Sequence, residues 1–161
     1  MTLAPLVEIE DLPQLLAPEA RLLGLDVGTK TIGLALSDVT RSIASPYHTV
    51  RRTRFTQDAQ AIAAAIEEHD VGALVIGLPI NLDGSEGPRA QSTRAFARNL
   101  AARVAVPLAF WDERLSTQAV ERHLIEADVT RKRRAEVIDR MAAAYILQGA
   151  LDRLKRLSEL G

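Results

Sequence analysis

The sequence contains no cysteine, which excludes disulfide bonds and thiolate metal sites. It also lacks any apolar run near the roughly 18–20 residues that a membrane-spanning helix needs. Its first residues show no basic stretch followed by an apolar one, so no secretory signal is predicted. The formal net charge is only −1, and any basic surface must therefore be local. We expect a cytoplasmic protein that is not associated with a membrane.

The composition is that of an ordinary globular protein. The chain has 161 residues, of which 47% are hydrophobic and 25% charged, enough for one domain with a substantial core. Residues 1–20 differ from the rest, with four acidic residues, three prolines and no Lys or Arg. We expect these residues to form an extension outside the core, mobile as chain ends often are, and residues 21–157 to form the domain.

The stretch from Arg21 to Asp38 predicts a β-hairpin. Two apolar runs, Leu22–Val27 and Ile32–Leu36, flank a short polar turn that contains glycine. Asp26 is the only charge in the first run, and a carboxylate there is costly to desolvate unless it is paired or binds a cation. The alternative is that Asp26 caps the turn through backbone N–H groups, and this stretch alone favours neither interpretation.

Hydrophobic periodicity predicts the remaining elements. Strands are expected at 46–52, where Pro46 would start an edge strand, at 73–78 and at 107–111. Helices are expected at 57–69, at 88–104 with Pro88 in its first turn, from Ser116 or Thr117 to about 127, and at 132–157. This order predicts an α/β domain, with a mixed five-stranded sheet and helices on both faces.

Three acidic residues stand out as candidates for chemistry: Asp26, Glu113 and Asp139. The strands at 22–27, 73–78 and 107–111 should be parallel, so their carboxyl ends share one edge, where sites gather in α/β sheets. Asp112 competes with Glu113, because adjacent strand residues point to opposite faces and geometry alone does not choose. The alternative for the acid that does not face Asp26 is a salt bridge to Arg114 or a charge at a helix N-terminus. Clustered carboxylates need cations, and oxygen ligands suit Mg²⁺ or Mn²⁺. Two such ions can activate water for phosphodiester cleavage.

Basic residues around this edge predict contacts with nucleic acid. The loop from Pro79 to Pro88 leads into a helix N-terminus, which favours anions, and Arg89 lies next to it. Lys30 lies in the hairpin turn, and Arg114 follows the last strand. The alternative for the loop is a plain strand-to-helix connection, and the alternative for Lys30 is an exposed lysine without a partner in function. For Arg114 the alternative is an ion pair with an acidic neighbour. The strongest local positive charge is the run Arg131, Lys132 and Arg133, which we interpret as a nucleic-acid patch rather than a solvated helix start.

Four ordered motifs, GLDVGTKTIGLALSD (24–38), VIGLPINLDGSEGPRA (75–90), FWDERLST (110–117) and VIDRMAAAYILQ (137–148), resemble the YqgF/RuvX family. Its members are described as Holliday junction resolvase-like proteins and pre-16S rRNA nucleases. The resemblance implies a ribonuclease H-like fold, a metal-dependent nuclease with the acidic trio Asp26, Glu113 and Asp139, and RNA or branched DNA as substrate. The position after Lys30 is often basic in this family, whereas in this chain it is Thr31.

Three other functions are alternatives to rRNA maturation. Resolution of Holliday junctions requires two symmetric sites and so predicts a homodimer. A non-catalytic RNA-binding factor in ribosome assembly would retain the acids for structure. The first motif also resembles the phosphate loop of actin-like ATPases and sugar kinases, but 161 residues leave no room for their second lobe.

Overall fold

The computed structural model describes residues 5–115 and 131–160, with the backbone alone at residues 115 and 131–138. Its centre is a mixed six-stranded sheet in the order β1-β6-β5-β2-β3-β4. The strands are β1 Leu6–Val7, β2 Arg21–Val27, β3 Thr31–Ser37, β4 Ala44–Arg51, β5 Val71–Leu78 and β6 Leu108–Asp112. The described helices are α1 Leu12–Leu15, α2 Phe55–Glu68, α3 Pro88–Ala101 and α5 Arg131–Leu160, with single 3₁₀ turns at Ile9–Asp11 and Glu113–Leu115.

The strands pair as the sequence predicts. β2 and β3 form the antiparallel hairpin, while β5 pairs parallel with β2 and β6 pairs parallel with β5. The carboxyl ends of β2, β5 and β6 therefore share one edge of the sheet. β4 is the edge strand beside β3, and Pro46 lies within it where the register with β3 shifts. Pro has no N–H to donate, and an edge strand tolerates this because its outer side has no neighbouring strand to bond.

The N-terminal segment corrects the expectation that it lies outside the core. β1 pairs parallel with β6, which gives the sheet six strands rather than five. Leu12 has no exposed surface and Ile9 only 4%, and both pack with residues of α5. The acidic and proline-rich composition concealed these few apolar residues, which are too short a series to show a clear period. The mobility of the segment and the domain boundary at residue 21 stay predictions.

The predicted helices over 57–69, 88–104 and 132–157 correspond to α2, α3 and α5, with Pro88 in the first turn of α3. The helix expected from Ser116 or Thr117 to about 127 lies outside the described residues. In that described part, no helix is both long and apolar enough to cross a membrane. The predicted α/β class is confirmed.

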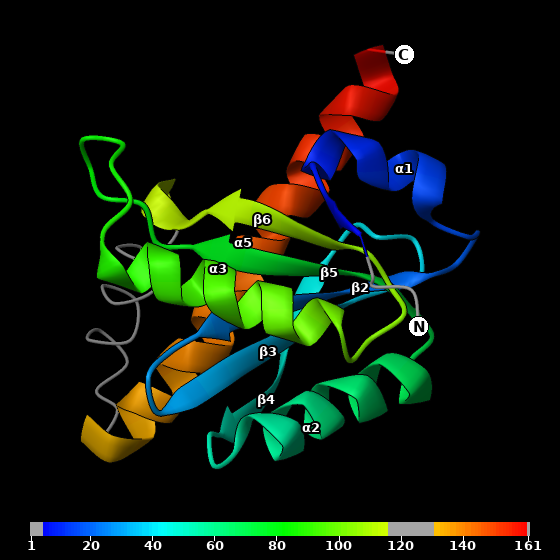
Figure 1. Ribbon diagram of the computed structural model, residues 1–161. Helices are drawn as coiled ribbons and strands as arrows, with labels where there is room; N and C mark the ends of the chain where they lie inside the picture. The colour runs from blue at the N-terminus through cyan, green and yellow to red at the C-terminus, as the bar shows by residue number, and fades with distance from the viewer. Residues whose placement is uncertain (1–4, 116–130, 161) are drawn as a thin grey trace.

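The helices form one layer on each side of the sheet (Figure 1). α2 and α3 cover one face, where the core contains large side chains such as Leu25, Leu74 and Phe96. α5 covers the other face, where the sheet contributes mainly small side chains such as Ala35 and Ala73. Alternation along β2 places Leu23 and Leu25 toward α2 and α3, and Leu22, Gly24 and Asp26 toward α5.

Candidate active site

Asp26 and Glu113 meet at the shared carboxyl edge of the sheet, on the face that α5 covers. Asp26 is the next-to-last residue of β2, and Glu113 follows the end of β6. Gly77 on the intervening strand β5 makes room for Glu113: a Cβ at Gly77 would lie 2.8 Å from Cγ of Glu113. The absence of a side chain at Gly77 therefore leaves room for Glu113 and for Ile146 of α5, whose Cδ1 would overlap that Cβ.

The carboxyl groups of Asp26 and Glu113 are hydrogen-bonded to each other. Burial, the charge of Asp26 and that hydrogen bond raise the pKa of Glu113 to about 8. Burial also raises the pKa of Asp26, and the nearby charge of Asp139 acts in the same direction. Near neutral pH, the pair of carboxyl groups thus retains one proton. Two carboxyl groups in contact are stable only with a cation between them, which in this pair is the proton.

Asp139 approaches this pair from α5, across the β2–β3 hairpin. Its charge acts on Asp26, and its Oδ2 atom accepts a hydrogen bond from the hydroxyl of Thr31. The helix comes very close at this point, because a Cβ on Gly33 would overlap the carbonyl oxygen of Asp139. Within the described residues, no three acidic or histidine side chains converge on a common point for an ion. The structure thus brings Asp26 and Glu113 together. It holds Asp139 beside them through the hydrogen bond from Thr31.

Asp112 has a different role from its neighbour Glu113. Its carboxylate accepts hydrogen bonds from Arg114, including one from Nε at 2.8 Å, and this pairing lowers its pKa. An ion pair with Arg114 was the alternative for whichever acid did not face Asp26, and the structure shows it for Asp112. Because the pair is exposed, it contributes little to stability.

Among the predicted cationic contacts, Arg89 lies closest to the acids. Its charge lowers the pKa of both Asp26 and Glu113, although the opposing effect of burial is larger. It lines a hollow of about 270 Å³ at the start of α3, with Asn81 and Gly87 among the other lining residues. Lys30 is exposed in the hairpin turn, and Arg114 is held by Asp112. Arg131, Lys132 and Arg133 begin α5, but their side chains lie outside the described residues.

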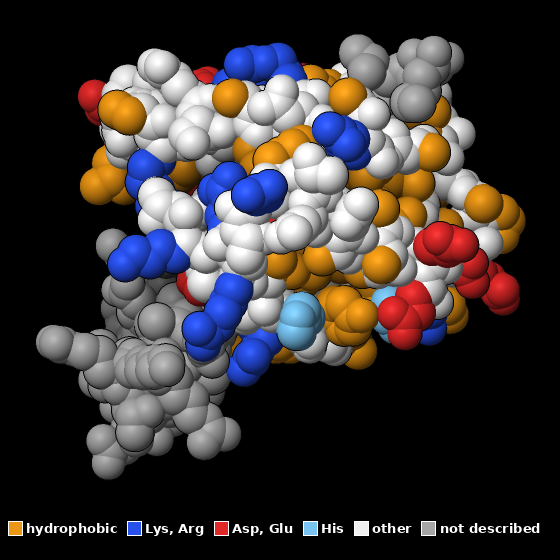
Figure 2. Space-filling view, turned by 60° about the horizontal axis from the view of Figure 1, so that its bottom comes forward, with side chains coloured by type: hydrophobic (Ala, Val, Ile, Leu, Met, Phe, Trp, Pro, Cys, Tyr) orange, Lys and Arg blue, Asp and Glu red, His pale blue; other side chains and the backbone are white. Residues whose placement is uncertain are grey.

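Charge is unevenly distributed along the molecule. In Figure 2, Lys and Arg side chains gather toward one side of the view, and acidic side chains toward the other. The sequence around α2 has the same polarity, with Arg51, Arg52 and Arg54 before its start and Glu67 and Glu68 at its end. Because Arg51 pairs with Thr31 in the sheet, the basic end of α2 lies at the same edge of the sheet as the candidate-site acids Asp26 and Glu113. Arg52 also braces the hairpin, donating to the carbonyl of Gly28 at 2.7 Å.

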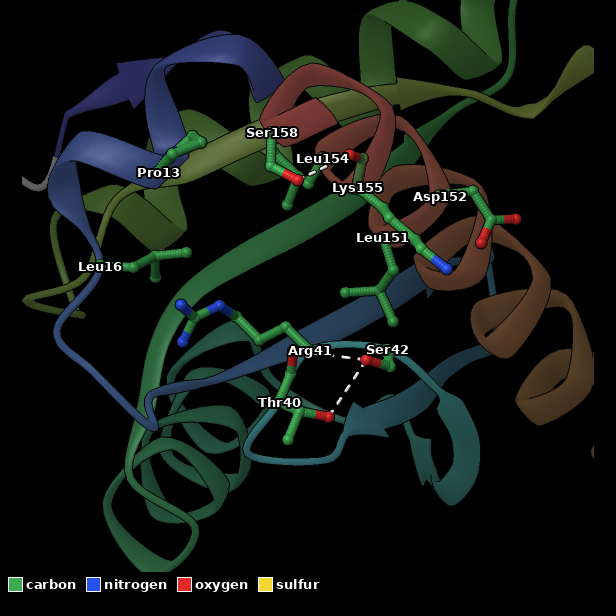
Figure 3. A pocket seen from close by; sticks show the side chains of 10 residues that line it. All are labelled: Pro13, Leu16, Thr40, Arg41, Ser42, Leu151, Asp152, Leu154, Lys155 and Ser158. Atoms are coloured by element: carbon green, nitrogen blue, oxygen red, sulfur yellow. Dashed lines mark hydrogen bonds between the residues drawn. The ribbon is translucent and has the colours of Figure 1, made fainter. Parts of the chain in front are cut away.

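A second cavity lies away from these acids. It measures about 310 Å³ and lies between α1, the β3–β4 connection and the last turns of α5 (Figure 3). Its lining includes Arg41, Asp152 and Lys155 but none of the predicted site residues. Arg41 is largely engaged in the fold, because its Nη1 donates to the carbonyl of Ala20 at 2.6 Å. The cavity is therefore separate from the candidate active site.

Sequence reasoning missed two features that shape the site. Thr31 stood out only as a departure from the family pattern, yet it holds the Asp139 carboxylate. The role of Gly33 and Gly77 was also missed, although a glycine within an apolar strand is itself a signal that another group approaches the backbone closely.

Comparisons with known proteins agree with this geometry. Residues 20–153 match the family model described as "RuvX: Holliday junction resolvase". A Methylocella silvestris protein named "Putative pre-16S rRNA nuclease" is 59% identical over 154 residues, covering 96% of each chain. A protein of that name from Paramagnetospirillum magneticum is 61% identical over 148 residues, covering 92% of this chain and 96% of its own.

A solved structure shares the fold. It is described as T. thermophilus RuvC in complex with Holliday junction substrate, and it gives a TM-score of 0.53 at 14% identity. The match covers 84% of this chain and 96% of that one. At this identity the likeness concerns the fold alone, and it confirms the predicted ribonuclease H-like architecture.

Proposed function

The chain belongs to the RuvX family, and from this premise and the site geometry we propose that it is a cytoplasmic, divalent-metal-dependent nuclease. The observation that carries the proposal is the half-buried Asp26–Glu113 pair at the carboxyl edge of the sheet. Two acids whose pKa values stay raised despite the nearby charge of Arg89 are poorly suited to stabilising a fold. They are well suited to binding a cation.

The residues fit a divalent ion. All the donors are carboxylate oxygens, the ligands that Mg²⁺ and Mn²⁺ prefer, and two adjacent carboxyl groups favour a cation between them. Asp26 and Glu113 would hold the ion, with Asp139 completing the set from α5. When bound, such ions supply activation of water and charge stabilisation at the leaving oxygen. The chain itself would hold and orient the ligands.

The substrate phosphate would lie in the hollow beside Arg89. The first backbone N–H groups of α3 are free of intrahelical partners, and a helix N-terminus favours anions. Arg89 lines this hollow, and its charge also acts on both Asp26 and Glu113. Lys30, Arg114 and the run Arg131, Lys132 and Arg133 would contact phosphates further along the strand.

We infer that the substrate is structured RNA, and specifically the 5′ end of the 16S rRNA precursor, because the relatives that cover almost the whole chain carry that name. The description of the matching family model favours a second candidate, cleavage of branched DNA junctions. That reaction would require a homodimer with two symmetric sites.

The test is a cleavage assay with Mg²⁺ or Mn²⁺ on precursor 16S RNA, single-stranded RNA and a four-way DNA junction. Asp26→Asn and Glu113→Gln should each reduce cleavage at least about 100-fold, beyond the ~10–100-fold typical of residues that only support metal ligands. Asp112→Asn is the matched control, since Asp112 is adjacent to Glu113 but pairs with Arg114. It should retain activity within about threefold, well below the effect on an outer-shell partner.

Circular dichroism and thermal unfolding of each variant show whether the fold persists. Cleavage of all three substrates by Asp26→Asn at the wild-type rate would end the proposal. Tight RNA binding with no cleavage under any metal would instead support the non-catalytic assembly factor.

A further inference from the structure

Thr31 links the hairpin to the acid that comes from the opposite end of the chain. Its hydroxyl donates to Oδ2 of Asp139, 108 positions further along the sequence. We propose that Thr31 is a positioning residue, which turns the Asp139 carboxylate toward Asp26 so that the two can share a divalent ion. This inference rests on the proposed metal site and assigns a role to a residue outside the acidic trio.

The backbone around Asp139 is already fixed by β3. Gly33 lies opposite Asp26 in the β2–β3 register, and the carbonyl of Asp139 sits where a Gly33 side chain would begin. Thr31 is two residues earlier on β3 and therefore points to the same face. Alternate positions of one strand thus hold the main chain and the side chain of Asp139.

The Asp139 side chain needs this second restraint because its charge faces another acid. Asp26 lies opposite Gly33 in the β2–β3 register and the Asp139 backbone lies against Gly33, so the two acids are neighbours, and like charges repel. An unrestrained aspartate would rotate away from such a neighbour. The Thr31 hydroxyl holds Oδ2, and an ion would bind through the other carboxylate oxygen, Oδ1. Such orientation of a ligand by a neighbouring hydrogen bond is the usual function of groups that surround a metal site.

The Thr31 hydroxyl has no comparable structural task in the turn. The main chain of Thr31 closes the turn by itself, accepting from the N–H of Gly28 at 2.8 Å and pairing with Arg51 in β4. Removing the hydroxyl should therefore leave the hairpin intact and change the position of Asp139.

The experiment compares Thr31→Val, which keeps the shape but loses the donor, with Thr31→Ser, which keeps the donor. Thr29→Val is the matched control, because Thr29 is exposed in the same turn. Mn²⁺ binding is measured directly from the free-ion electron paramagnetic resonance signal, and cleavage is measured as a function of Mn²⁺ concentration. Thermal unfolding without metal reports on the fold.

We expect Thr31→Val to weaken Mn²⁺ binding about 10-fold, the lower end of the effect of losing such a partner. The Mn²⁺ concentration for half-maximal cleavage should rise equally, while the apo melting temperature stays unchanged. Thr31→Ser and Thr29→Val should both behave like the wild type.

Two results would overturn the inference. If Thr31→Val binds Mn²⁺ as well as the wild type, or more tightly, the hydroxyl does not direct Asp139 to the ion; tighter binding would mean that it holds Asp139 away. If Thr31→Ser does not restore binding, the hydrogen bond is not the cause. If the wild-type protein binds no Mn²⁺, or if Asp26→Asn binds it as well as the wild type, the proposed metal site itself is refuted, and the role of Thr31 with it. If Asp26→Asn loses binding and Thr31→Val does not, only the inference about Thr31 fails.

Discussion

The two faces of the sheet are built from different kinds of residues and do different work. Toward α2 and α3 the sheet presents bulky side chains, among them Leu25, Leu34 and Ile76. Toward α5 it presents Gly24, Gly33 and Gly77 at positions where any Cβ would press on a neighbour. The first face gains stability from buried area. The second brings a helix almost into contact with the strand backbones.

All three predicted acids belong to the second face. Glu113 lies over Gly77 and interacts with Asp26, and the backbone of Asp139 lies over Gly33. Close packing without side chains determines the height of α5 above the sheet, and that height determines where Asp139 lies relative to Asp26. The two faces therefore differ in function. Loss of a side chain on the α2–α3 face should lower stability without moving the acids, whereas a small displacement of α5 on the other face should move Asp139.

The largest effect should come from adding one methyl group at Gly33. The new Cβ would overlap the backbone of Asp139, which cannot rotate aside as a side chain can, so α5 must move. We expect Gly33→Ala to destabilise the protein by about 1–3 kcal/mol or more. Cleavage should fall at least about 100-fold, because a displacement near 1 Å at a catalytic group can have that effect.

Leu34→Ala is the control for this test, because Leu34 is the next residue of β3 and packs on the opposite face of the sheet. Leu34 is only 1% exposed, so its truncation should cost about 2–5 kcal/mol. Turnover at a temperature where the variant is folded should nevertheless stay near the wild-type value. Urea unfolding and single-turnover cleavage measure the two quantities. If Leu34→Ala loses as much activity as Gly33→Ala, the proposed division between the faces is wrong.

An intermediate effect should appear as a pH dependence of stability in the apo protein. The pKa of Glu113 is raised from 4.5 to about 8, so between these values the folded state binds more protons than the unfolded state. The free energy of unfolding must then fall as pH rises from about 4.5 to 8. In chelator, the melting temperature should decrease across this range, and Mn²⁺ should reverse the decrease at pH 8.

Glu113→Gln removes the titrating group and should flatten most of that slope. Asp38 and Asp112, whose pKa values are lowered, act at more acidic pH and leave this window unaffected. A wild-type melting temperature that stays level or rises from pH 5 to 8 would contradict the raised pKa of the pair.

Much of this arrangement was predictable from the sequence, for physical reasons. The hairpin, the parallel strands and the long α5 all have strong periodicity, and parallel strands place their ends at one edge. That logic alone brought Asp26 and Glu113 together. Strand geometry could not choose between Glu113 and Asp112, because the choice depends on where β6 ends and the 3₁₀ turn begins, a shift of one residue; only the family resemblance indicated Glu113.

Other features depend on tertiary contacts that no local pattern encodes. β1 is only two residues long and exists because the edge of β6 is available to it. The hydrogen bond from Thr31 to Asp139 joins residues 108 positions apart, and neither residue type specifies such a partner. Sequence periodicity could assign both residues to elements, but only the packing of α5 on β3 shows that they meet.

The smallest effect should come from Gly149→Ala. Gly149 is a residue of α5 that faces the sheet, and it lies against a side chain instead of a backbone. A Cβ there would lie 2.8 Å from the indole ring of Trp111. The ring can shift, so the overlap should cost about 1–3 kcal/mol. Replacing a helical glycine by alanine returns about 1 kcal/mol. Gly149→Ala should therefore lower the free energy of unfolding by no more than about 2 kcal/mol, the difference between these two contributions. Cleavage, measured in the same single-turnover assay, should stay near the wild-type rate, because the overlap is with the Trp111 side chain and not with the backbone that carries an acid. Damage as great as that of Gly33→Ala would mean that the whole length of α5, and not only its contact with β3, sets the geometry of the acids.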